Sequence, residues 1–141
     1  MPRHPLHAPL VHFPLALLGT SLVFDVVGIV RGEALWWAIG FWNVALGLTV
    51  SVATAVTGFV DSLRVVPDSP ASPIVTRHML SVLTSLSCYG AAMFVRGGPG
   101  AATGLTRSAT LALEAVGFVL LMLAGWLGGE MVYRHGVGRM S

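Results

Sequence analysis

The chain has 141 residues, of which 55% are hydrophobic and only 10% charged, and its mean hydropathy is +0.80. A soluble domain carries roughly 25% charged residues, because water must solvate its surface. The composition therefore excludes a water-soluble globule and requires lipid around much of the chain. The eight basic residues are all arginines, scattered singly and opposed by six acids, which excludes a nucleic-acid-binding face.

Four apolar segments follow one another along the chain, over residues 10–30, 35–60, 74–95 and 109–132. Each reaches the ~20 residues that a helix needs to cross about 30 Å of hydrocarbon, and only a helix satisfies its own backbone there. The sequence predicts an all-α fold, an integral membrane four-helix bundle with up-down-up-down topology. We expect one transmembrane domain that covers residues 1–141.

Small residues spaced four apart punctuate the segments. Such pairs let helices approach closely in lipid. The pairs are Gly47 with Ser51, Ala53 with Thr57, and Gly125 with Gly129.

An even number of spans places both termini and the 61–73 loop on the same side of the bilayer. The arginines on that side are Arg3, Arg64, Arg77, Arg134 and Arg139. The opposite side has Arg31, Arg96 and Arg107. The positive-inside rule then favours cytoplasmic termini.

All five histidines fall on the side that holds the termini: His4, His7, His12, His78 and His135. His12 and His78 lie inside or at the rim of the apolar zone, near the starts of the first and third segments. In an up-down-up-down bundle these two helices are diagonal neighbours, so their imidazoles can point at one central atom. This arrangement suits a haem iron, whose axial ligands approach from opposite faces of a flat ring. We therefore expect haem b to be bound by His12 and His78.

Other residues of the same region support this hypothesis. Arg77 lies at the boundary where a haem propionate would need a cationic partner. On the third helix, small or weakly polar side chains share a face with His78 and leave room for a cofactor. They are Ser81, Ser85, Cys88 and Ala92.

Two other hypotheses remain open. A zinc, copper or iron ion without haem could be held by a set drawn from His7, His12, His78, Asp61 and Glu130. Alternatively, the chain is a structural or assembly subunit in which the histidines only anchor helices. Asp61 and Glu130 either orient ligand histidines or, as we prefer, pair with nearby arginines.

Asp25 lies thirteen residues beyond His12, roughly 20 Å along the helix. It therefore belongs to the opposite interface, where we expect it to pair with Arg31 or water.

The two predicted hairpins resemble each other. Each begins with a histidine, His12 or His78, and each ends with an acid followed by an arginine on the same side. A duplicated hairpin would create a pseudo-two-fold axis, with one histidine from each half beside it.

The whole chain resembles a family of small bacterial membrane proteins catalogued as a domain of unknown function. The resemblance is carried by His4-Pro5, Val11-His12-Phe13-Pro14, Arg77-His78 and Gly129-Glu130-Met131-Val132-Tyr133. It implies four spans and the bacterial cytoplasmic (inner) membrane. Some relatives are joined to Rieske-type iron–sulfur domains, which implies an electron-transfer setting.

The sequence shows no nucleophile–base constellation and no phosphate-binding loop. We therefore expect an electron-transfer or binding protein rather than a stand-alone enzyme. Its partners would be the lipid bilayer, a redox protein and a second copy of the chain, and not nucleic acid.

Overall fold

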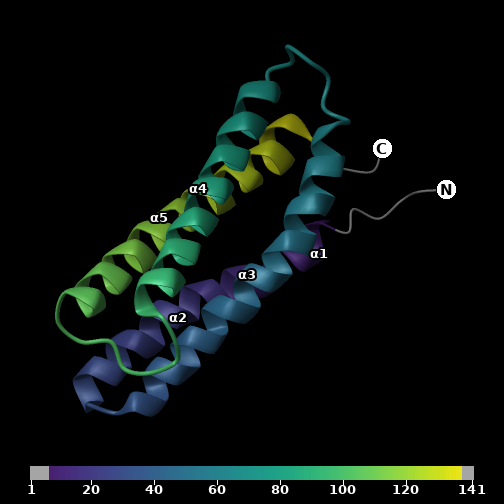
Figure 1. The fold of residues 1–141 in the computed structure, drawn as a ribbon. Helices are drawn as coiled ribbons and strands as arrows, with labels where there is room; N and C mark the ends of the chain where they lie inside the picture. The colour runs from purple at the N-terminus through teal and green to yellow at the C-terminus, as the bar shows by residue number, and fades with distance from the viewer. Residues whose placement is uncertain (1–6, 138–141) are drawn as a thin grey trace.

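Helices make up most of residues 7–137, the part of the chain that this computed structural model describes (Figure 1). They are α1 (His7–Leu10), α2 (His12–Arg31), α3 (Ala34–Ser62), α4 (Ser72–Arg96) and α5 (Gly104–His135). α1 is a single turn that leads into α2, and the other four helices correspond to the four predicted spans. The all-α four-helix fold is confirmed, with α5 beginning five residues earlier than the apolar segment.

Short turns fold the spans into two hairpins, α2 with α3 and α4 with α5. Gly32 ends α2 with φ 67° and Gly97 ends α4 with φ 73°, a left-handed conformation that glycine adopts without steric cost. In the first turn, hydrogen bonds from Arg31 and Trp36 hold the pKa of the exposed Glu33 carboxyl below its ordinary value. These contacts hold the short turn between α2 and α3.

The helices are arranged so that α2 and α4 lie diagonally opposite each other. Each hairpin is packed most extensively within itself, and the hairpins meet through α2 with α5 and α3 with α4. Figure 1 shows both hairpins running along one long axis. The 31–33 and 97–103 turns lie at one end, which we call the turn end, and the segment that joins the hairpins lies at the other, the histidine end.

The bundle buries a set of polar groups beside its apolar core, and much of its outer surface is apolar. α2, α3, α4 and α5 are each long and apolar enough to cross a membrane. Large apolar side chains such as Val30, Phe94 and Trp126 are exposed. Buried polar residues come from all four helices and include Ser21, Asp25, Ser51, Thr54, Ser85, Arg96, Thr110 and Glu114. This distribution fits a protein surrounded by lipid, in which apolar side chains face the lipid and polar ones pair with each other inside the bundle.

The two hairpins are related by an internal repeat. Four of the five buried residues of α2 are matched 71 residues later by buried residues of α4, as in the contacting pair Leu18 and Tyr89. The same correspondence, shortened by one residue, links α3 with α5. The matched pairs are Pro14 with Ser85, Ser21 with Ala92, Gly40 with Thr110, Val44 with Glu114, Gly47 with Gly117 and Thr54 with Ala124.

Matched residues meet each other at the centre of the bundle. The Tyr89 hydroxyl donates a hydrogen bond of 2.9 Å to the Leu18 carbonyl oxygen. Leu18 packs against Gly47, and Tyr89 packs in the same way against Gly117. Contacts between equivalent positions are the signature of a two-fold relation. Because both hairpins begin at the same end, the pseudo-two-fold axis runs along the bundle.

Candidate functional site

The pseudo-two-fold relation brings His7 and His78 into equivalent environments. His7 lies on α1 with its Nδ1 atom 2.9 Å from the Thr54 carbonyl oxygen of α3. His78 lies on α4 with its Nδ1 atom 2.8 Å from the Ala124 carbonyl oxygen of α5. Both side chains are half-buried. The two histidines thus form a matched pair at the histidine end.

These hydrogen bonds determine which nitrogen of each ring carries the proton. A backbone carbonyl oxygen only accepts, so Nδ1 of His7 and Nδ1 of His78 must each donate. In the neutral imidazole, Nε2 then keeps its lone pair. A histidine that donates through Nδ1 to a carbonyl and presents Nε2 is the usual form of a metal-ligating histidine.

Glycines lie beside both rings. A Cβ atom placed on Gly58 would be 2.7 Å from Cε1 of His7. At the equivalent Gly128, the same construction gives 3.6 Å to Cε1 of His78, an ordinary contact. Small residues on α3 and α5 therefore leave space for the imidazoles, and the fit is tighter around His7.

His12 differs from the expectation that it points into the bundle. Its side chain is exposed, whereas Pro14 is buried. Two residues correspond to about 200° around an α-helix, so the two side chains point to nearly opposite sides of α2. The histidine that pairs with His78 in the repeat is thus His7. α1 extends the helical path one turn before the apolar segment and carries His7 to the level of Thr54.

The two acids that the sequence offers as ligands form ion pairs within their own segments. Asp61 accepts a hydrogen bond of 3.0 Å from Arg64, and Glu130 accepts one of 3.0 Å from Arg134. This is the alternative that the sequence analysis prefers for both acids. The Arg77 side chain is exposed at the same end of the bundle.

The structure describes one more histidine, His135, which is exposed at the end of α5, while His4 lies outside the described residues. Within residues 7–137, no three His, Cys, Asp or Glu side chains gather as a metal site.

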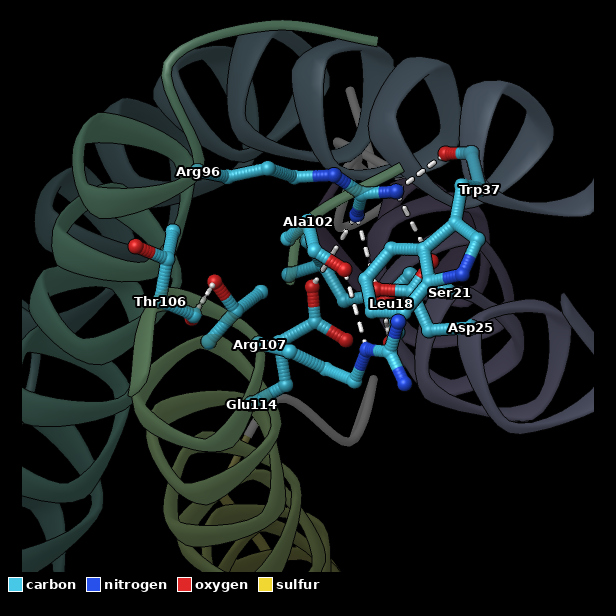
Figure 2. A network of polar contacts seen from close by, with 10 residues as sticks. Leu18, Ser21, Asp25, Trp37, Arg96, Ala102, Thr106, Arg107 and Glu114 are labelled. Carbon is cyan, nitrogen blue, oxygen red and sulfur yellow. Dashed lines mark hydrogen bonds and ion pairs between the residues drawn. The ribbon is translucent and has the colours of Figure 1, made fainter. Parts of the chain in front are cut away.

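A second polar group lies near the turn end, where Asp25, Arg96 and Glu114 meet (Figure 2). Arg96 donates to both carboxylate oxygens of Asp25, at 2.7 and 3.0 Å, and also to the carbonyl oxygen of Trp37. Its Nη1 atom is 3.8 Å from Glu114 Oε1. The three side chains are at most 1% exposed. We call them the buried charge cluster.

Sequence reasoning placed Asp25 at the correct end but gave it the wrong partner. Arg31, its expected partner, pairs with Glu33 instead. The signal that could have identified the cluster is that Glu114 and Arg96 are also ionisable residues within or at the end of a span. Such residues face the bundle interior and pair with one another.

Comparison with known proteins bears on the whole chain. No curated protein and no solved structure matches it significantly. A family described as predicted membrane proteins matches residues 3–141, in agreement with the four spans and with the resemblance carried by the histidine-rich opening. The chain belongs to this family, whose description is "Predicted membrane protein (DUF2231)".

Proposed function

We propose that the chain is a membrane electron-transfer protein in which His7 and His78 bind haem b between the two halves of the bundle. The observation that carries the proposal is the matched pair of imidazoles, each fixed by an Nδ1–H to carbonyl bond and each presenting Nε2. Two histidines are the only iron ligands that a protein must provide for bis-histidyl haem, because the porphyrin would supply the other four nitrogens. A pseudo-two-fold axis between the ligands matches the symmetry of that arrangement.

The protein's part in this function is to hold and orient the ligands. The Thr54 and Ala124 carbonyls fix the planes of the two rings and increase the basicity of Nε2. The exposed Arg77, at the same end, is available to a propionate. Bound iron would supply a one-electron couple for exchange with a redox partner protein.

We further propose that the histidine end faces the cytoplasm of a bacterial cell. Exposed arginines at that end are Arg64, Arg77 and Arg134. At the turn end, Arg31 is exposed and Arg107 is half-buried, while the charge of Arg96 is paired inside the buried charge cluster. Removing Arg96 from the balance strengthens the positive-inside argument.

The test begins with the visible spectrum of protein purified from haem-replete cells, before and after reduction with dithionite. We expect sharp reduced bands from a six-coordinate low-spin iron. His7→Ala and His78→Ala should each abolish or shift these bands, because each removes one axial ligand. His12→Ala, on the exposed side of α2, and His135→Ala are the matched controls and should leave the spectrum unchanged.

The two glycines offer a finer test that leaves every ligand in place. Gly58→Ala would press its new methyl group against His7, while Gly128→Ala would meet His78 at an ordinary distance. Gly58→Ala should therefore weaken haem retention or shift the reduced bands, and Gly128→Ala should resemble the wild type. The reverse order would contradict the assigned ligand geometry.

Metal analysis run in parallel identifies the competing outcomes. Stoichiometric zinc, copper or iron without porphyrin would overturn the haem proposal in favour of a non-haem metal site that draws on residues beyond the pair. A folded, helical, colourless and metal-free preparation would overturn both and leave a structural or assembly subunit.

A further inference from the structure

The buried charge cluster contains one more acid than base. Asp25 comes from α2, Arg96 from α4 and Glu114 from α5. Arg96 neutralises one carboxylate, and its hydrogen bonds go to Asp25 and the Trp37 carbonyl. If both acids were ionised, a net negative charge would remain in a site that is at most 1% exposed. An uncompensated charge in such a place is strongly unfavourable, because no water solvates it.

The atoms of the cluster show where compensation is missing. Glu114 Oε1 faces Arg96, whereas Glu114 Oε2 is buried with no hydrogen-bond partner among the described residues. Both carboxyl groups approach the same atom, Arg96 Nη1, with Asp25 Oδ2 at 2.7 Å and Glu114 Oε1 at 3.8 Å. Two ionised carboxylates that share one cation repel each other, and a proton on one of them removes that repulsion.

Among the described residues, Arg96 is the only cation that forms an ion pair with Asp25 or Glu114. Tyr89 of α4 is near Glu114, but its hydroxyl already donates to the Leu18 carbonyl oxygen. Arg107 of α5 lies in the same region (Figure 2) and its Nε donates to the Ala102 carbonyl oxygen. α3 contributes the Trp37 carbonyl and an indole ring, neither of which titrates.

The turn end has a cavity beside a residue that contacts the cluster. A cavity of about 270 Å³ lies there, lined by residues that include Gly32, Glu33, Trp37 and Arg107. The Trp37 ring also stacks on the Arg96 guanidinium, with Cζ 4.7 Å from the ring centroid. The Trp37 side chain therefore contacts both the cavity and the buried charge cluster.

We propose that Asp25 and Glu114 form a proton-binding site that exchanges one proton with the aqueous phase at the turn end. The proton comes from hydronium or a buffer acid and forms an O–H bond at Glu114 Oε2, leaving water or the buffer base behind. The Asp25 carboxylate stays ionised and bound to Arg96. The cluster is then neutral when loaded and carries one negative charge when empty.

Infrared spectroscopy of the full chain in lipid nanodiscs tests this site, because a protonated carboxyl group has a C=O stretch distinct from that of a carboxylate. The wild type at neutral pH should show one such band, and transfer to D₂O should shift it. Glu114→Gln should remove the band. Glu130→Gln, whose carboxylate pairs with Arg134 at 3.0 Å, is the matched control and should retain it.

Two further variants keep the proposal testable if Glu114→Gln does not fold. Asp25→Asn should also remove the band, because Glu114 then becomes the ionised partner of Arg96. Arg96→Gln should strengthen it, because both acids then lack a cation. The proposal is overturned if the wild type has no protonated-carboxyl band, if Glu114→Gln retains it, or if the band never shifts in D₂O.

Discussion

Replacing Arg96 by glutamine should destabilise the bundle far more than replacing its acidic partner Asp25 by asparagine. Arg96→Gln removes two charge-assisted bonds to Asp25 and one to the Trp37 carbonyl, and leaves two buried acids with no cation. Breaking a buried ion pair from one side costs about 3–5 kcal/mol. Asp25→Asn leaves Glu114 beside Arg96 as a counter-charge, with 3.8 Å between Nη1 and Oε1. Its cost should be about 1.5–3 kcal/mol, the value of hydrogen bonds to a charged group.

The free energy of unfolding can be measured by denaturing-detergent titration in mixed micelles, with helix content followed by circular dichroism. Arg31→Gln is the control, because its pair with Glu33 is exposed on both sides and water screens it, so its loss should change the free energy of unfolding little. The reasoning is refuted if Arg96→Gln is no more destabilising than Arg31→Gln, or if Asp25→Asn costs more than Arg96→Gln.

Three further predictions concern packing, electrostatics and topology. Gly117→Ala would place a methyl group 2.9 Å from two ring carbons of Tyr89 and should cost about 1–3 kcal/mol in the same titration, whereas Gly125→Ala, which meets nothing within 4 Å, should be neutral or slightly stabilising. The Glu33 carboxyl should titrate below its ordinary pKa by NMR, and Trp36→Phe should raise that pKa; an unchanged titration in the variant would contradict this assignment. Since the folded-state pKa is depressed, the stabilisation from Glu33 is present above the unfolded-state pKa and is lost as the pH falls through the folded-state pKa. Reporters fused after the last residue and in the segment between α3 and α4 should lie on the same side, and reporters in the two short turns on the other; a split within either group would refute the topology.

The spans could be predicted from sequence because hydropathy and length are local properties. The four helices begin and end within a few residues of the expected segments, apart from α5. The α5 helix begins at Gly104, where the sequence is small and polar and hydropathy gives no signal. The face of small or weakly polar side chains on the third predicted span, α4, was also predicted, and Ser81, Ser85 and Ala92 are buried on it.

The partners of the polar residues could not be predicted in the same way. Asp25 was assigned to Arg31 because that arginine is close in sequence, but the cation it binds is 71 residues away on a diagonal helix. Pairing across the bundle depends on the rotation of each helix about its axis, and a continuous apolar segment does not determine that rotation.

The register of the internal repeat was hidden by the chemistry of the matched positions. Equivalent residues such as Leu18 and Tyr89, or Val44 and Glu114, have little in common except burial. The sequence therefore aligns His12 with His78, whereas the structure matches His78 with His7, five residues earlier than His12. Small-residue pairs were no better guide, because Gly47 packs against Leu18 while Gly125 faces outward.

The opposite charges at the matched positions Asp25 and Arg96 make the two halves of the chain complementary and not interchangeable. Two copies of the first hairpin joined about the same axis would bring aspartate against aspartate, and two copies of the second would bring arginine against arginine. Like charges thus disfavour the packing of either hairpin against a copy of itself, and opposite charges favour its packing against the other hairpin. During synthesis, α2 and α3 would enter the membrane with Asp25 still lacking its cation, and the interior of the bundle would be completed only when α4 delivers Arg96.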